Sequence, residues 1–196
     1  MKPYLILMVA ALPLSGCISF GAKPPPSLLT LTSAAALPPS EGRSVTAAEA
    51  IVINVPTSPQ AIATTRVAVS DGATAIAYIQ KAVWVEPPAR LFQRLLSETI
   101  AAKTGKIALD PRQTSLTPAL QLSGQLLRFG VDAGNSDAVI IYDAILTRDA
   151  GKSVMTRRFE ARSPATIIEA NVSGAALNRA ANQIAGEVAT WVGEAK

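Results

Sequence analysis

The sequence of 196 residues contains no histidine and a single cysteine, Cys17. Histidine is the commonest general base, the commonest metal ligand and the usual partner of a serine or cysteine nucleophile. One cysteine allows neither an intramolecular disulfide nor a CxxC site. The composition therefore argues against most familiar enzymes, and we expect no catalytic, cofactor-binding or metal-binding residues.

Aromatic residues and concentrated charge are also scarce. Phe, Trp and Tyr make up 5% of a chain that is 49% hydrophobic, so we expect a core of Ala, Val, Ile and Leu with a few aromatic anchors. The formal charge is +4, but the basic residues are scattered, and their tightest cluster is Arg157-Arg158 followed by Arg162. A nucleic-acid binder usually carries a concentrated basic stripe, so no nucleic-acid partner is expected.

The first 17 residues, MKPYLILMVAALPLSGC, have the three-part pattern of a secretory signal. Lys2 supplies the positive charge, an apolar run continues to about Leu14, and two small residues precede Cys17. A transmembrane helix is the alternative, but Pro13 interrupts the run, which is shorter than the roughly 20 residues that cross a bilayer. We expect a cleaved leader over residues 1–16.

The tetrapeptide Leu14-Ser15-Gly16-Cys17 resembles the bacterial lipobox. That resemblance implies a diacylglycerol on the thiol and cleavage before the cysteine, which makes Cys17 the lipid attachment site and the means of membrane association. The alternative, an incidental or buried free cysteine, requires the thiol to fall at the end of an apolar run by accident. In such lipoproteins an aspartate after the cysteine retains the protein at the inner membrane. Ile18 occupies that place, so we expect a periplasm-facing anchor in the outer membrane of a Gram-negative bacterium.

The segment 17–27 is expected to be a tether, because Pro24-Pro25-Pro26 favours an extended polyproline II conformation. We expect one domain over 28–196, without internal repeats. Short β-branched runs and alternating patterns predict its strands, with a hairpin at Asp71-Gly72. The predicted strands are 28–32, 51–55, 66–70, 75–79, 107–110, 120–129, 138–147 and 154–161.

Two amphipathic helices complete the predicted domain. One is expected over 88–103, because prolines precede apolar residues at three- and four-residue spacing and Gly105 is a natural C-cap. In the second, the apolar positions from Leu177 to Trp191 step by three and four, which favours packing on the sheet over a partner helix or membrane. The fold class is therefore α+β, with a mainly antiparallel β-sheet and two helices packed on one face.

Four residues of the domain are candidates for partner contact. Tyr78 and Trp84 are large aromatics near strand ends, although such residues more often belong to the core. Arg157 and Arg158 are suited to an acidic partner or lipid headgroups, although a solvated strand face is the simpler interpretation.

The carboxylates offer no catalytic pattern. Glu86, Glu98 and Glu160 are not spaced to pair with one another or with a nucleophile. The acidic turn at Asp132 and Asp137 lacks the later glutamate of a calcium loop.

Several segments, in this order along the chain, resemble the ABC-type transport auxiliary lipoproteins. The resemblance implies a non-enzymatic lipoprotein that works beside ABC transporter subunits and an MCE-domain protein in moving phospholipid or other lipids between the two membranes. It also suggests a homo-oligomer, and it transfers no catalytic site. The matching segments are Cys17, 28–32, 51–56, 66–84, 120–124, Phe129, 138–147, Arg158-Phe159 and Trp191-Val192.

Two further functions stay open at this point. One is a lipoprotein that itself binds a small apolar ligand between the sheet and its helices, or acts in envelope assembly. The other is a periplasmic hydrolase, which would need a convergent Ser-Lys or Asp pair in a cleft.

Overall fold

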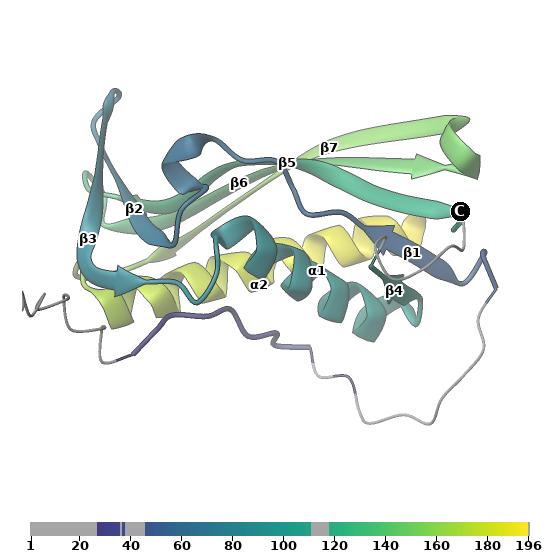
Figure 1. Ribbon diagram of the computed structural model, residues 1–196, viewed down its shortest axis with the longest axis horizontal. Coiled ribbons are helices and arrows are strands. Elements are labelled where there is room, and N and C mark those ends of the chain that lie inside the picture. Colours follow the sequence, from purple (N-terminus) through teal and green to yellow (C-terminus); the bar gives the residue numbers. More distant parts are fainter. Residues whose placement is uncertain (1–26, 36, 38–45, 111–117, 196) are drawn as a thin grey trace, which may run out of the picture.

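The computed structural model describes residues 27–35, 37, 46–110 and 118–195. The described chain forms a sheet with two α-helices on one of its faces (Figure 1). This arrangement confirms the predicted α+β class. In chain order the elements are β1 (Ala50–Ile53), the 3₁₀ turn η1 (Gln60–Ile62), β2 (Arg66–Asp71), β3 (Ala75–Val83), α1 (Pro88–Thr104), β4 (Ile107–Leu109), β5 (Leu120–Asp132), β6 (Asp137–Arg148), the 3₁₀ turn η2 (Asp149–Gly151), β7 (Ser153–Pro164) and α2 (Ala170–Glu194).

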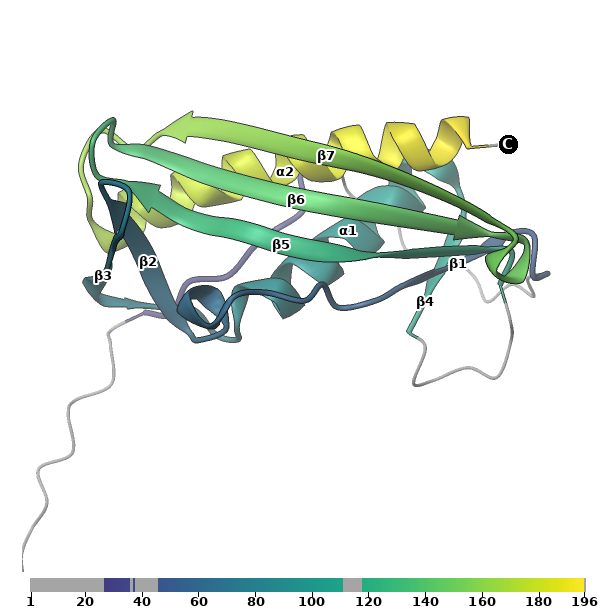
Figure 2. The same ribbon diagram turned by 90° about the horizontal axis from the view of Figure 1, so that it is seen from above.

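Strand β5 is a central strand of the sheet, with paired strands on both of its edges. One edge of β5 pairs with β6 from Leu120 to Asp132, and β6 pairs in turn with β7, both antiparallel. The other edge is shared: β1 pairs in parallel with the first residues of β5, and β2 pairs in parallel with the last ones. Figure 2 shows β5, β6 and β7 side by side over the length of the molecule.

The parallel pairings are the main departure from the predicted meander. Strands β1 and β4 also pair in parallel, whereas β2 and β3 form the antiparallel hairpin expected at Asp71-Gly72. Parallel strands need a long crossover connection, and α1 lies between β1 and both of its parallel partners. The sheet is therefore mixed, with its longest pairings antiparallel.

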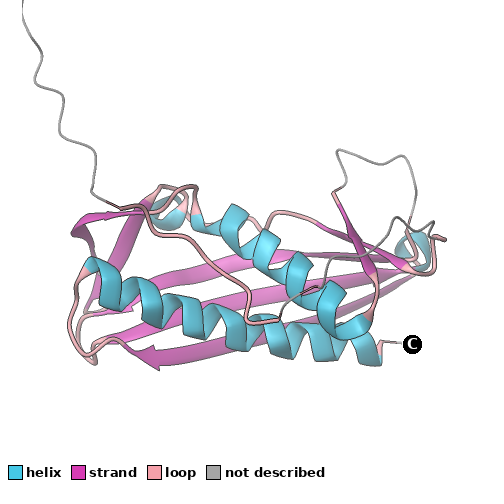
Figure 3. Cartoon of the chain, turned by 90° about the horizontal axis from the view of Figure 1, so that it is seen from below, coloured by secondary structure: helices cyan, strands magenta, loops and turns pink. Residues whose placement is uncertain are grey.

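Helix α1 begins and ends where its sequence predicts. Pro88 occupies the first turn, and Gly105 caps the C-terminus at φ 70°, with its N–H donating to Ala101 O at 3.0 Å. Leu91, Phe92 and the other apolar residues of the stripe are buried. Figure 3 shows α1 and α2 lying together across one face of the sheet.

The core between the sheet and the helices contains a run of aromatic rings. Phe92 packs edge-to-face on Tyr142 at 5.2 Å and on Phe129 at 6.5 Å, and Phe129 meets Trp84 at 5.7 Å. Tyr142 donates its hydroxyl to Ser123 O at 2.9 Å, and burial raises the pKa of that hydroxyl. The aromatic anchors therefore hold α1 against the middle of the sheet.

Helix α2 buries the predicted stripe, including Leu177, Ile184 and Val188. Near its C-terminus the half-buried Trp191 packs edge-to-face on Phe159 of β7 at 5.7 Å. The helix therefore packs on the sheet, as its periodicity indicates.

The predicted strand at 28–32 is wrong. Only Leu29 joins the sheet, through an isolated bridge to Trp84 in which Leu29 N–H donates to Val83 O at 2.8 Å. The chain then leaves the sheet edge and crosses the helices, where Thr32 and Ala34 meet polar side chains of α2. We call residues 27–35 the strap.

Candidate functional site

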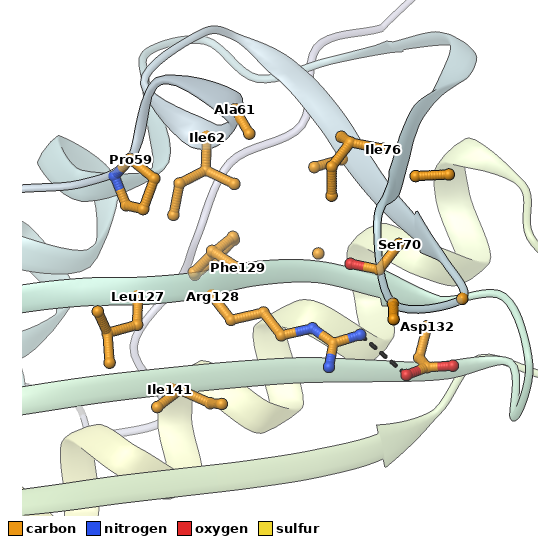
Figure 4. A pocket seen from close by; sticks show the side chains of 15 residues that line it. Pro59, Ala61, Ile62, Ser70, Ile76, Leu127, Arg128, Phe129, Asp132 and Ile141 are labelled. Carbon is orange, nitrogen blue, oxygen red and sulfur yellow. Dashed lines mark hydrogen bonds and ion pairs between the residues drawn. The ribbon is translucent and has the colours of Figure 1, made fainter.

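A pocket of about 450 Å³ lies on the face of the sheet opposite the helices (Figure 4). Its lining residue Ile141 lies on the open face, because it alternates with the buried Ile140 and Tyr142. Ile62 of η1 and Ile76 of the β2–β3 hairpin form two of the walls. The pocket is suited to an apolar group.

Arg128 and Asp132 place charge in this pocket. Their Nη2 and Oδ2 atoms lie 2.9 Å apart, and Asp132 Oδ1 also accepts from Gly134 N–H at 3.0 Å. The hydrogen bond from Arg128 lowers the pKa of Asp132, with the turn amides adding to the effect. The buried Nε of Arg128 has no hydrogen-bond partner in the described structure.

A β-bulge brings Arg128 to the open face. The β5–β6 register shifts between Leu126 and Arg128, so that Leu127 is an extra residue. A bulge changes which face the following side chains occupy. The alternating pattern of the sequence predicts a strand here but carries no signal for this extra residue.

Tyr78 supports one wall of the pocket. Its hydroxyl donates to Ala61 O of η1 at 3.2 Å, and the Arg66 guanidinium lies 3.8 Å from the ring centroid. The half-buried ring therefore ties η1 to the β2–β3 hairpin. Trp84, in contrast, is 1% exposed and belongs to the core.

Arg157 and Arg158 lie on β7, far along the sheet from Tyr78, and serve different contacts. Arg158 forms a bidentate ion pair with Asp143, with N–O distances of 2.6 and 2.7 Å. The guanidinium carbon of Arg157 lies 5.0 Å from the centroid of the Phe159 ring. The ion pair lowers the pKa of Asp143. Both arginines border a shallow depression of about 740 Å³ in the open face. The four candidate residues are therefore not brought into one site.

Polar side chains of α2 hold the strap, a contact that the sequence analysis missed. Asn182 accepts from Ala34 N–H at 2.7 Å and donates to Thr32 O at 2.9 Å, while Asn178 accepts from Thr32 N–H at 2.9 Å. Asparagine has both a donor and an acceptor, so it can pair with an extended backbone as another strand would. The available signal was a pair of asparagines four residues apart on one helix.

Two of the three carboxylates considered as acid or base groups form ion pairs with arginine. Glu86 lies 2.9 Å from Arg94, and Glu160 lies 3.0 Å from Arg162. Within the described ranges no group of three or more acidic or cysteine side chains is placed to hold a metal ion. Cys17 and its leader lie outside the described residues.

These features define a two-layer α+β domain with a pocket on the open sheet face. The chain belongs to the family of ABC-type transport auxiliary lipoprotein components, whose model matches residues 29–189. It therefore has a role associated with ABC-type transport. Residues 27–35, 37, 46–110 and 118–195 include no helix long and apolar enough to cross a membrane.

Two solved structures are similar to this chain in fold. Protein XCC0632 from Xanthomonas campestris, of family DUF330, is 22% identical with a TM-score of 0.64 over 73% of this chain and 82% of that chain. An uncharacterised protein is 12% identical with the same TM-score of 0.64, over 74% of this chain and 93% of that chain. No curated protein matches the chain.

Proposed function

We propose that this protein is an outer-membrane-anchored periplasmic lipoprotein and a non-enzymatic auxiliary subunit of an ABC/MCE-type system that transports phospholipid between the membranes. The observation that carries the proposal is the family match over residues 29–189. A transport auxiliary needs a docking surface and an anchor rather than a catalytic centre.

The proposed anchor is a lipid on Cys17, and residues 1–16 are its signal peptide. The lipobox Leu14-Ser15-Gly16-Cys17 supports this assignment, and Ile18 in place of aspartate supports the outer membrane. One acyl chain gives only marginal membrane binding, whereas two or more give a stable anchor. A diacylated Cys17 is therefore sufficient to hold the mature chain, 17–196, at the membrane.

The anchor is tested by substitution of two residues in the full chain. Cys17→Ser is expected to leave an unprocessed or soluble precursor, seen by intact mass and membrane fractionation. Ile18→Asp is expected to move the mature protein to the inner-membrane fraction, with Ile18→Val as the matched control that stays in the outer membrane. Unchanged mass and fractionation of the Cys17 variant would refute lipidation.

The partners are tested by crosslinking in cells of the native host. We expect the tagged full chain to capture an MCE-domain protein together with ABC transporter subunits, and copies of itself if it forms a homo-oligomer. Capture of envelope enzymes alone, with no transporter component, would contradict the proposal. Non-lipidated Cys17→Ser provides the control for capture that needs the anchor.

A second candidate function is the binding of a small apolar ligand, and the pocket beside Ile62 and Ile76 favours it. The space between the sheet and the helices, where the sequence predicts such a ligand, is occupied by Phe92 and Tyr142, both 0% exposed. Native mass spectrometry after gentle extraction checks this candidate. A ligand that is lost in Ile62→Asp but kept in the open-face control Val154→Asp supports it, whereas a consistently empty protein refutes it.

A further inference from the structure

We infer that one end of the domain, formed by the β2–β3 hairpin tip, the loop before α2 and the start of the strap, lies against the bilayer that holds the lipid. We call this the hairpin end. The inference rests on the proposed lipidation of Cys17 and adds to it an orientation and a second membrane contact.

The first argument is the place where the chain enters the described fold. Leu29 is fixed by two backbone hydrogen bonds, from its N–H to Val83 O at 2.8 Å and from Val85 N–H to its own carbonyl at 2.9 Å. It also packs against Gly174, near the start of α2. Figures 1 and 2 show the beginning of the described chain at the same end of the molecule as the hairpin and the start of α2. The strap therefore fixes the attachment point of the tether at the hairpin end.

The second argument is the length of the connection to the lipid. Ten residues lead from Cys17 to Ser27, and a fully extended chain of that length spans at most roughly 33–36 Å. The 13 residues of β5 separate the hairpin end from the far end of the sheet, which corresponds to roughly 40 Å. The tether therefore lets the hairpin end touch the bilayer, and it is too short for the domain to stand upright on its far end.

The third argument is the chemistry of the hairpin end. A ladder of paired residues crosses the sheet there, from Ile76 through Ser70, Asp132 and Asp137 to Pro164. Ile76 is 50% exposed, and Ile167, in the loop that follows Pro164, is also 50% exposed.

Two more exposed apolar residues lie beside the Leu29 bridge at this end. Leu28 is 51% exposed and Val85 is 44% exposed, and both neighbour the Leu29 bridge. Transfer of such exposed apolar side chains from water into the acyl region is favourable, in proportion to the apolar area that is buried. Half of the exposed large hydrophobic residues of the described chain thus lie at the end that the tether can bring to the membrane.

Charge does not explain this contact. The charged residues at this end are of both signs: Asp71, Asp137 and Glu169 are acidic, whereas Lys81 of β3 and Arg179, which donates to Pro164 O at 2.9 Å, are basic. Such a mixed set gives anionic lipid little net attraction. The contact is therefore apolar, and it should persist when the salt concentration is raised.

The experiment uses the lipidated full chain in vesicles of phosphatidylethanolamine and phosphatidylglycerol. Cysteine is introduced at one position at a time, as Ile76→Cys or Ile167→Cys, and labelled with an environment-sensitive fluorophore. Lipidated Cys17 has no free thiol, so the introduced cysteine takes the label alone. Val154→Cys is the matched control, because Val154 is 58% exposed and pairs with Thr147 near the far end of the sheet.

Labels at 76 and 167 are expected to show a blue shift in emission and a loss of intensity when the vesicles contain doxyl-labelled lipid, both unaffected by salt. The label at 154 is expected to show neither change. Quenching at 154 alone, equal quenching at all three positions, or no quenching at any of them would overturn the inference. Shielding of 76 and 167 only after an MCE-domain protein is added would also overturn it, in favour of a protein partner. Intact mass read on the same samples reports lipidation of Cys17, so failure of the anchor is distinguished from failure of the orientation.

Discussion

The two faces of strands β5, β6 and β7 share one backbone but differ in what they carry. Toward the helices these strands present Leu126, Tyr142 and Phe159, all at most 2% exposed. Toward solvent they present residues such as Ile145 and Asp143, and Asp143 forms an ion pair with Arg158. One face therefore holds the fold together, and the other can change without loss of the fold.

The largest effect is expected from a cavity in the core between the sheet and the helices. Phe92→Ala removes the ring that contacts both Phe129 and Tyr142, and we expect a loss of about 3–5 kcal/mol in the free energy of unfolding, measured by urea denaturation. On the open face, Ile145→Ala is expected to change it by less than about 0.5 kcal/mol. Equal losses for the two variants would contradict the contrast between the faces.

A smaller effect is expected at Gly124 of β5, where the backbone of β6 leaves no room for a side chain. A Cβ on Gly124 would lie 2.1 Å from Asp143 O, and this glycine has φ +153°. Gly124→Ala should cost about 2–4 kcal/mol in the free energy of unfolding. Gly72→Ala, at φ +65° with no atom near its added Cβ, should cost roughly 1 kcal/mol, because it carries the backbone strain without the clash. A Gly124 variant as stable as the Gly72 variant would show that the strands separate easily.

A further effect is expected at the strap, which is hydrogen-bonded to the outer side of α2. Asn182→Ala removes hydrogen bonds to Thr32 and Ala34, at an expected cost of about 1–2 kcal/mol in the free energy of unfolding. Hydrogen exchange at the Ala34 amide should become faster. The control Gln183→Ala lies on the same helix, and its side chain donates to Glu187 of that helix, so it should leave exchange in the strap unchanged. Unchanged exchange in the Asn182 variant would mean that the strap is held by other contacts.

The smallest effect is expected on the open face, at Asp143. Arg158 holds the pKa of Asp143 below its ordinary value of 3.8, so the stabilising contribution of the ionised carboxylate is present above about pH 4 and is lost as the pH falls through the lowered pKa. Asp143→Asn should therefore be slightly less stable than the wild type at pH 7, and the two proteins should converge in acid. Denaturation midpoints measured from pH 7 to pH 2 check the sign, and a gap that widens in acid would refute it.

Local sequence predicted the elements well because each had its own signal. The helix after Pro88 and the hairpin at Asp71-Gly72 depend on residues that are neighbours in the chain. The partners of β1 and β2 could not be predicted in this way, because an apolar run has no preference for one strand rather than another. Leu29 was placed in a strand for the same reason: its neighbours form an apolar run, and only tertiary contacts show that the run leaves the sheet.

The pocket was less predictable than the fold. Tyr78 and Trp84 looked equivalent in sequence, yet one lies against η1 and the other is buried beside Phe129. The extra residue Leu127 that brings Arg128 to the open face leaves no local mark. Both features depend on contacts between segments that are far apart in the chain.

The shared edge of β5 has a consequence for the order of folding. Ile51 of β1 pairs with Leu120, and Ala68 of β2 pairs with Gly130. Strands β1 and β2 can therefore complete their pairing only with β5, which lies some 60 or more residues later in the chain. Hairpins β5–β6 and β6–β7 close over short turns, and such local contacts form sooner than distant ones. The C-terminal half should therefore fold first and serve as the template onto which the N-terminal half docks.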